Sequence, residues 1–159
     1  NPDIFLYYVR KKRCKQLTYH YGIDTEPTWS PNGKKILFTS NRSGTPQIYE
    51  INISNGKIRR KTFEGTYNAR ARYLPDGKSF VLIHRESGLF HVAVQNLRNG
   101  RLRILTETAL DESPTISPNG NIEGEIRVPP GKLVIHEGAE ISGQCFITSS
   151  DKKNISSKS

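Results

Sequence analysis

A six-residue segment that recurs three times at a nearly constant interval constrains the fold of this chain more than any other feature. Residues 28–33 (TWSPNG) recur 44 residues later as 72–77 (RYLPDG), and again 43 residues after that as 115–120 (TISPNG). Two further markers keep the same period: Leu17-Thr18, Lys61-Thr62 and Leu105-Thr106, and then Asp24, Asn68 and Asp111. A period near 43 residues with several short strands in each unit is typical of β-propellers.

Each repeat contains four short apolar or alternating segments separated by turn residues. The predicted strands are 28–30, 35–40, 47–53 and 57–63 in one unit, then 72–74, 79–84, 90–96 and 102–106 in the next. Residues 3–9 and 15–19 resemble the outer two strands of a preceding unit. We therefore predict an all-β, partial propeller of about two and a half four-stranded antiparallel blades. Because closure needs four to eight blades, we interpret the chain as a fragment of a longer protein.

The best candidates for a functional site are the polar residues that precede the innermost strand of each blade. In a propeller this loop lies at one mouth of the central channel, so equivalent loops of successive blades converge. The candidate set is Asp24, Glu26, Asn68, Arg70, Asp111 and Glu112, with His20 as a possible neighbour at the same mouth. Such a ring could hold a partner's peptide or a cation. The alternative is that these side chains only cap loops and tie neighbouring blades together.

The charge of the chain does not by itself assign a partner. The formal net charge is +9, and all the excess lies in the first 120 residues. The densest basic run, residues 10–13, falls where a hairpin tip is expected and has no aromatic platform for stacking bases, so we predict no nucleic-acid binding. No apolar run is long enough to cross a membrane, so we predict no membrane insertion. The chain also has no nucleophile, phosphate-binding or metal-binding motif, and we predict no catalytic residue and no cofactor.

Several stretches of the repeat resemble the propeller of the TolB family. They are residues 1–4 (NPDI), 23–29 (IDTEPTW), 38–49 (FTSNRSGTPQIY), 62–70 (TFEGTYNAR), 83–85 (IHR) and 105–114 (LTETALDESP). The order of the IDTEP, YNAR and DESP segments is the specific part, because propellers attached to serine peptidases also carry the SPNG turn. The resemblance covers residues 1–120.

The resemblance implies a six-bladed propeller in the periplasm of Gram-negative bacteria that has no catalytic activity. TolB-like propellers belong to the Tol-Pal envelope system, which supports outer-membrane integrity and constriction at cell division. They bind the lipoprotein Pal at one end of the central channel. The family's amino-terminal domain, which contacts TolA, is not in this sequence, so we do not expect a TolA-type partner.

After Gly120 the sequence departs from the family pattern. Short apolar doublets with glycine between them suggest β-helix rungs over 121–148, and the stretch 122–147 weakly resembles bactofilin, a β-helical scaffold. The alternative is an extra hairpin that pairs onto the last blade. Residues 149–159 are polar and are predicted to be disordered.

Three functions follow from these patterns. The first is a protein-binding propeller of the TolB type that presents its channel mouth to a Pal-like partner. The second is a structural scaffold that self-associates through its tail. The third is the accessory propeller of a serine peptidase, which requires a hydrolase domain outside this sequence.

Overall fold

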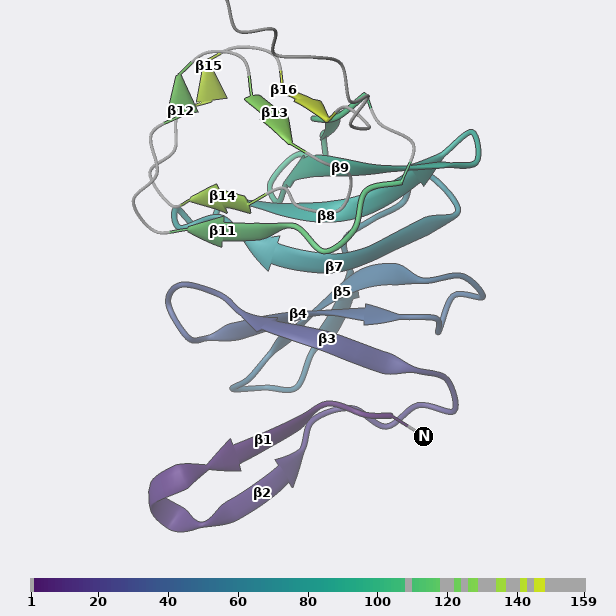
Figure 1. Ribbon diagram of the computed structural model, residues 1–159. Helices are drawn as coiled ribbons and strands as arrows, with labels where there is room; N and C mark the ends of the chain where they lie inside the picture. Colours follow the sequence, from purple (N-terminus) through teal and green to yellow (C-terminus); the bar gives the residue numbers. More distant parts are fainter. Residues whose placement is uncertain are drawn as a thin grey trace, which may run out of the picture.

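The structure of the protein is a computed structural model, which describes residues 2–107, residues 110–117 and five later strand segments. The predicted boundary at residue 120 and the predicted disorder of 149–159 lie outside the described residues. Figure 1 shows an antiparallel strand pair followed by two four-stranded sheets, arranged as successive layers. Within the described part, no helix is both long enough and apolar enough to cross a membrane.

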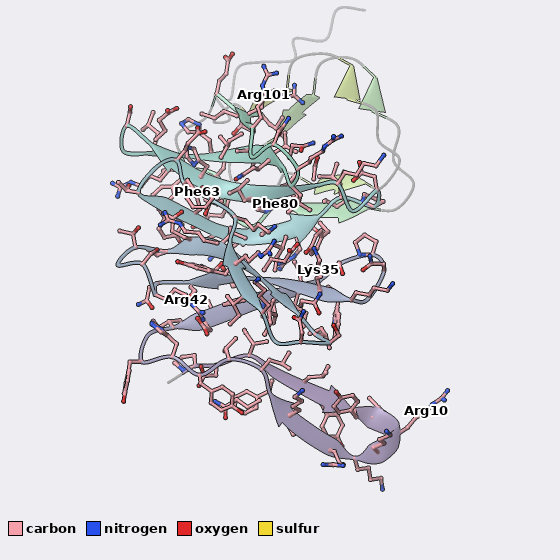
Figure 2. All side chains as sticks on the ribbon, turned by 180° about the vertical axis from the view of Figure 1, so that it is seen from behind. Arg10, Lys35, Arg42, Phe63, Phe80 and Arg101 are labelled. Atoms are coloured by element: carbon pink, nitrogen blue, oxygen red, sulfur yellow. The ribbon has the colours of Figure 1, made fainter. Side chains whose placement is uncertain are left out.

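The strand pair is the outer half of a blade. It consists of β1 (Phe5–Tyr8) and β2 (Arg13–Gln16), joined by a single 3-10 turn, η1 (Val9–Lys11). Lys12 closes this turn with a left-handed backbone, φ +47°. The basic run therefore lies at an exposed hairpin tip, as predicted, with Arg10 at the end of the hairpin in Figure 2.

The two four-stranded sheets share one topology, in which every strand is antiparallel to its neighbours. The first contains β3 (Asp24–Trp29), β4 (Lys35–Ser40), β5 (Gln47–Asn52) and β6 (Ile58–Arg60). The second contains β7 (Tyr67–Tyr73), β8 (Ser79–Glu86), β9 (Leu89–Asn96) and β10 (Leu102–Ile104). Together with β1 and β2 they confirm the predicted partial propeller. The innermost strands β3 and β7 begin four and five residues earlier than predicted, because pairing resumes beyond a bulge.

The core lies between the layers. Because neighbouring residues of a strand point to opposite faces, each buried strand contributes to two interfaces. The interface between the four-stranded sheets buries Leu37, Ile48, Ala71, Tyr73, Phe80, Leu82 and Ala93. The interface between the first strand pair and the first sheet buries Ile4, Ile36, Phe38, Tyr49 and Ile51. Fully burying a Leu, Ile or Phe side chain contributes about 1.5–3 kcal/mol, so stacking of blades is the main source of stability.

The recurring turn that revealed the repeat has the same geometry in both complete blades. Gly33 and Gly77 have φ of +65° and +62°, and each N–H donates to a carbonyl three residues earlier, at 2.8 and 2.9 Å. A residue with a Cβ atom rarely adopts this conformation, which explains why glycine recurs there. Gly120, the third member, lies outside the described residues.

The recurring threonine holds the third and fourth strands of each blade together. The hydroxyls of Thr18, Thr62 and Thr106 accept hydrogen bonds from the backbone N–H groups of Ile4, Ile48 and Val92, at 2.9, 2.9 and 3.0 Å. All three threonines are buried. Because a buried N–H without a partner is costly, this one side chain is required at the same place in every blade.

From β11 onward the strand pairing no longer follows the blade pattern. β11 (Thr115–Ser117), β12 (Ile122–Glu123) and β13 (Ile126–Val128) pair in parallel with β14 (Val134–His136), β15 (Ile141–Ser142) and β16 (Cys145–Ile147). Thr115 faces Val134, Ile122 faces Ile141 and Ile126 faces Cys145, a constant separation of 19 residues. Parallel pairs at one separation are the arrangement of β-helix rungs, whereas the alternative of a hairpin requires antiparallel pairs. The chain lacks the apolar second strand that would continue a blade after β11.

A buried polar network lies between the two sheets near the start of β7. Asn68 donates to Gln47 Oε1 at 2.9 Å and to the Glu64 carbonyl at 2.7 Å, and its oxygen lies 2.9 Å from His84 Nδ1. A Cβ atom on Gly65 would lie 2.5 Å from the His84 ring, so the glycine makes room for the imidazole. Burial lowers the pKa of His84, an effect that Glu86 and Glu64 oppose and His91 reinforces.

The threonine bond can be tested with Thr62→Val, which keeps the shape of the side chain. The Ile48 N–H would lose its acceptor, and we expect the free energy of unfolding to fall by about 1–3 kcal/mol. Chemical denaturation followed by circular dichroism measures this change. Thr66→Val, at an exposed position, is the matched control and should change stability by less than about 0.5 kcal/mol. Equal effects of the two variants would contradict the assignment.

His84 should make stability depend on pH. Since its pKa is lower in the folded chain than in the unfolded chain, the unfolded state takes up the proton first as the pH falls. Stability is therefore complete above the unfolded value of about 6.5 and decreases below it, by at most about 1.4 kcal/mol per pH unit. His84→Gln should lose less stability than the parent chain between about pH 7.5 and 5. Parallel losses in the two proteins, measured by urea titration at both pH values, would refute this role.

Candidate functional site

The first polar residue of each predicted loop is buried and joins one blade to the previous one. The backbone N–H groups of Asp24, Asn68 and Asp111 donate to the carbonyls of Pro2, Pro46 and Phe90, at 2.9, 2.9 and 3.2 Å. The three donors hold equivalent positions in successive units, and so do the three acceptors. All three side chains at the donor positions are buried as well. The structure therefore brings these predicted residues to equivalent places in the fold, where they fasten blades together.

Asp24 forms the strongest charge contact of this group. Its Oδ2 lies 2.7 Å from Arg42 Nη2, and the carboxylate is fully buried. The guanidinium also lies over the rings of Phe38 and Tyr49, at 5.3 and 5.0 Å from their centroids. A buried carboxylate requires such a partner, since an unpaired charge in the interior is very costly. Arg42 thus compensates Asp24 at this end of the first four-stranded sheet.

Two residues further on, each of the three units has a residue with a left-handed backbone. Glu26, Arg70 and Ser113 have φ of +55°, +58° and +48°. In β3 and β7 these residues lie inside a bulge, where the register slips between Thr25 and Thr28 and between Ala69 and Arg72. Bulges redirect side chains and are common beside functional sites. Sequence reasoning selected Glu26 and Arg70 but missed Ser113, although the 44- and 43-residue spacing would have found it.

These three residues form a continuous row across successive blades. Glu26 Oε1 lies 3.1 Å from Arg70 Nε, and Glu26 Oε2 accepts from the Arg70 backbone N–H at 3.0 Å. Thr39 supports the carboxylate with a hydrogen bond of 2.8 Å. The Arg70 guanidinium also donates to the Ser113 hydroxyl. We call Glu26, Arg70 and Ser113 the inner row.

The inner row is more accessible than Asp24, Asn68 and Asp111, which we call the buried ring. The side chains of Glu26 and Arg70 are 28% and 38% exposed. Glu112 is exposed beside a hollow of about 200 Å³ that Arg70 also lines, together with Phe90 and Leu110. The structure thus brings Arg70 and Glu112 to one hollow. The exposed groups, unlike Asp24 and Asn68, are able to meet a partner.

His20 organises the loop that leads into β3. Its Nδ1 accepts a hydrogen bond from the Gly22 N–H at 2.9 Å. A Cβ atom on Gly22 would lie 2.9 Å from the His20 ring and 1.9 Å from Asn41 Oδ1, so only glycine fits between them. His20 therefore shapes the connection between the strand pair and the first sheet.

The connections between blades also expose large apolar side chains that sequence reasoning did not select. Tyr19, Tyr21 and Ile23 precede β3, Phe63 precedes β7 and Leu110 follows β10. Their exposed fractions range from 49% for Ile23 to 99% for Tyr21. Figure 2 shows Phe63 and Arg42 toward one end of the sheets and Lys35 toward the other. Only the period hints at this group, because Tyr19 and Phe63 hold equivalent positions.

The described residues contain no group of three or more His, Cys, Asp or Glu side chains that could hold a metal ion. Three of the four acidic members of the predicted ring engage other partners instead: Asp24 pairs with Arg42, Glu26 with Arg70, and Asp111 Oδ2 accepts from the Thr106 hydroxyl. At this end of the fold, these carboxylates are therefore engaged in ion pairs and hydrogen bonds with protein side chains.

Comparison with known proteins agrees with the repeat and the blade topology. The profile described as TolB beta propeller domain matches residues 1–123. The Tol-Pal system protein TolB of Bordetella pertussis is 50% identical over 42 residues, which is 26% of this chain and 10% of that protein. TolB of Ruthia magnifica is 44% identical over 62 residues, 38% of this chain and 14% of that protein.

A solved structure extends the likeness to three dimensions. The crystal structure of TolB from Acinetobacter baumannii superposes with a TM-score of 0.69 at 40% identity, covering 76% of this chain and 31% of that one. The chain thus spans less than a third of the length of that TolB. Because the profile covers most of the sequence and the same blades recur in the crystal structure, this chain belongs to the TolB β-propeller family.

Proposed function

We propose that this chain is a non-catalytic, protein-binding part of a Tol-Pal propeller and that it binds the lipoprotein Pal in the periplasm. The inner row and Glu112 are the proposed contact residues. The observation that carries the proposal is the partly exposed pair of Glu26 and Arg70, held by bulges at equivalent places in adjacent blades. Through Pal, the protein would contribute to outer-membrane integrity and to constriction at cell division.

The surface chemistry near the inner row supports a protein partner. Arginine and aromatic side chains are enriched where proteins bind one another, and charged pairs at the rim fix the orientation of the partner. The connections between blades expose Tyr19, Tyr21 and Phe63, and the inner row supplies Arg70. Asp24, Asn68 and Asp111 would act indirectly, by holding the loops in place.

The names of the relatives support the proposed location and partner. The relatives from Bordetella and Ruthia are both named Tol-Pal system proteins. The carboxylates near the inner row are held in ion pairs, Asp24 with Arg42 of its own blade and Glu26 with Arg70 of the next, which suits recognition better than acid-base catalysis. Because the chain spans only part of its relatives, Pal binding is proposed for the assembled propeller that contains these blades.

The double variant Arg70→Gln, Glu112→Gln tests the proposed contact. It removes one positive and one negative charge at the hollow and leaves the buried ring intact. We expect the affinity of the propeller for the soluble domain of Pal to fall about 5- to 30-fold. Surface plasmon resonance measures the change.

Asp76→Asn, Lys78→Gln is the matched control, since it removes one charge of each sign from exposed positions in the turn between β7 and β8. It should leave Pal affinity within about twofold of the parent. If the control weakens binding as much as the test variant, the contact lies elsewhere.

A second function, self-association through the tail, is favoured by one observation. Three parallel strand pairs share a constant separation of 19 residues. In the part of the tail that the structure describes, β14, β15 and β16 are therefore the outer strands of this stack. A parallel ladder that ends in unpaired edges is a template for further strands. We propose that a second copy of this chain stacks on that end.

Deletion of residues 122–147 tests the self-association. The parent chain should sediment as species whose mass rises with concentration, because stacking of copies follows mass action. The deletion variant should sediment as a monomer over the same range in analytical ultracentrifugation. A parent chain that stays monomeric at all concentrations would rule the scaffold role out.

A further inference from the structure

A cleft of about 630 Å³ opens between the two four-stranded sheets at one end of their interface. Its walls come from the turns at Pro31 and Pro75, from the β9–β10 turn at Arg98, and from β4, β5 and β7. Figure 2 shows Lys35, which lines the cleft, toward the end of the sheets away from Arg42 and Phe63. Both walls belong to complete blades, so the cleft does not depend on blades outside this chain.

The floor of the cleft is a cluster of paired charges around Glu50. One carboxylate oxygen accepts a hydrogen bond of 3.0 Å from the Tyr73 hydroxyl. The other lies 3.0 Å from Lys35 Nζ and 3.2 Å from Lys61 Nζ. The Glu50 side chain is only 7% exposed, that of Lys61 is 18% exposed and that of Lys35 is 42% exposed. Exposure to solvent thus increases from the buried carboxylate to Lys61 and then to Lys35.

This cluster departs from the repeat that governs the rest of the fold. The positions equivalent to Glu50 in the preceding and following units are Leu6 and Val94. Those equivalent to Lys61 are Leu17 and Leu105. Replacing buried ion pairs with packed apolar residues is often neutral or stabilising, so blade stacking does not require charges here. A local departure from the pattern that stabilises a fold is expected where a function has been added.

The cleft is positively charged overall. Burial by itself raises the pKa of Glu50, but the hydrogen bonds and charges of Lys35 and Lys61, with the Tyr73 hydroxyl, outweigh it and lower the pKa. Glu50 is therefore ionised at neutral pH and neutralises only one of the two lysines. At the rim, Lys78 and Arg98 outnumber Asp76, so the lining has an excess of two positive charges.

The two lysines keep the capacity to bind a further anion. An ammonium group has three N–H donors, and the structure describes one acceptor for each, a Glu50 oxygen. Glu50 holds both ammonium groups at the floor, while the cations of the rim stand at the opening. The volume lies within the range of small-ligand sites.

We propose that the cleft binds a small ligand with two oxyanion groups, carboxylate or phosphate. One group meets Lys35 and Lys61 at the floor, and the other meets Lys78 and Arg98 at the rim. Glu50 and Tyr73 position the floor lysines and do not touch the ligand. This site is separate from the inner row and does not depend on Pal binding.

Isothermal titration calorimetry at low ionic strength tests the site, with citrate and pyrophosphate as probes and acetate as the single-group comparison. We expect citrate, pyrophosphate or both to bind the full chain at least about tenfold more tightly than acetate, because two groups engage two pairs of cations. Tighter binding of citrate would indicate a carboxylate ligand, and tighter binding of pyrophosphate a phosphate ligand.

Lys61→Gln and Lys78→Gln should each weaken the preferred probe about tenfold, since each removes one charge-assisted hydrogen bond. Lys15→Gln makes the same charge change at an exposed position of β2, outside the cleft, and should stay within about twofold. Circular dichroism without probe checks folding, and Lys78→Gln keeps the test valid if Lys61→Gln unfolds. Failure of citrate and pyrophosphate to bind at about 10 mM, or equal loss in Lys15→Gln, would overturn the proposal.

Discussion

The backbone hydrogen bond that joins each blade to the previous one, near the start of its first strand, is the contact on which the rest of this structure depends. Asp24, Asn68 and Asp111 each make it with the backbone N–H. Within each blade, Thr18, Thr62 or Thr106 then joins the third and fourth strands. Gln47 links the two kinds of bond, because its Oε1 accepts from both Thr62 and Asn68. The pairing of strands within a blade is thereby coupled to the stacking of one blade on the next. This alignment places the apolar side chains of neighbouring layers in contact.

The period of the sequence predicted the strands, the turns and the equivalence of the inner loops, since each of these repeats with the same residue types. It could not predict which side chains at the loops are buried. Burial of Asp24 depends on the cation Arg42, and the equivalent position in the next blade holds an acidic residue, Glu86. The left-handed backbone at Glu26 and Arg70 was also unpredictable, as neither residue type favours it. The pairing of the tail depended on contacts between residues 19 apart that no short motif encodes.

The two ends of the sheets differ in their chemistry. At the end near Arg42, carboxylates and guanidinium groups alternate and largely neutralise one another, and large apolar side chains of the connections stand exposed. At the end near Lys35, a cleft with an excess of positive charge opens between the sheets. One scaffold thus offers a surface suited to a folded protein and a cavity suited to a small anion.

The bulges that contain Glu26 and Arg70 have a consequence for the energetics of recognition. A side chain on a regular edge strand keeps much of its rotational freedom until a partner arrives, and that freedom is lost on binding. Here the ion pair, the backbone N–H of Arg70 and the Thr39 hydroxyl already restrict both side chains. The entropic cost of ordering these side chains is incurred when the chain folds. A docking protein therefore meets a preorganised pattern of charges, and little affinity is lost to ordering them on binding.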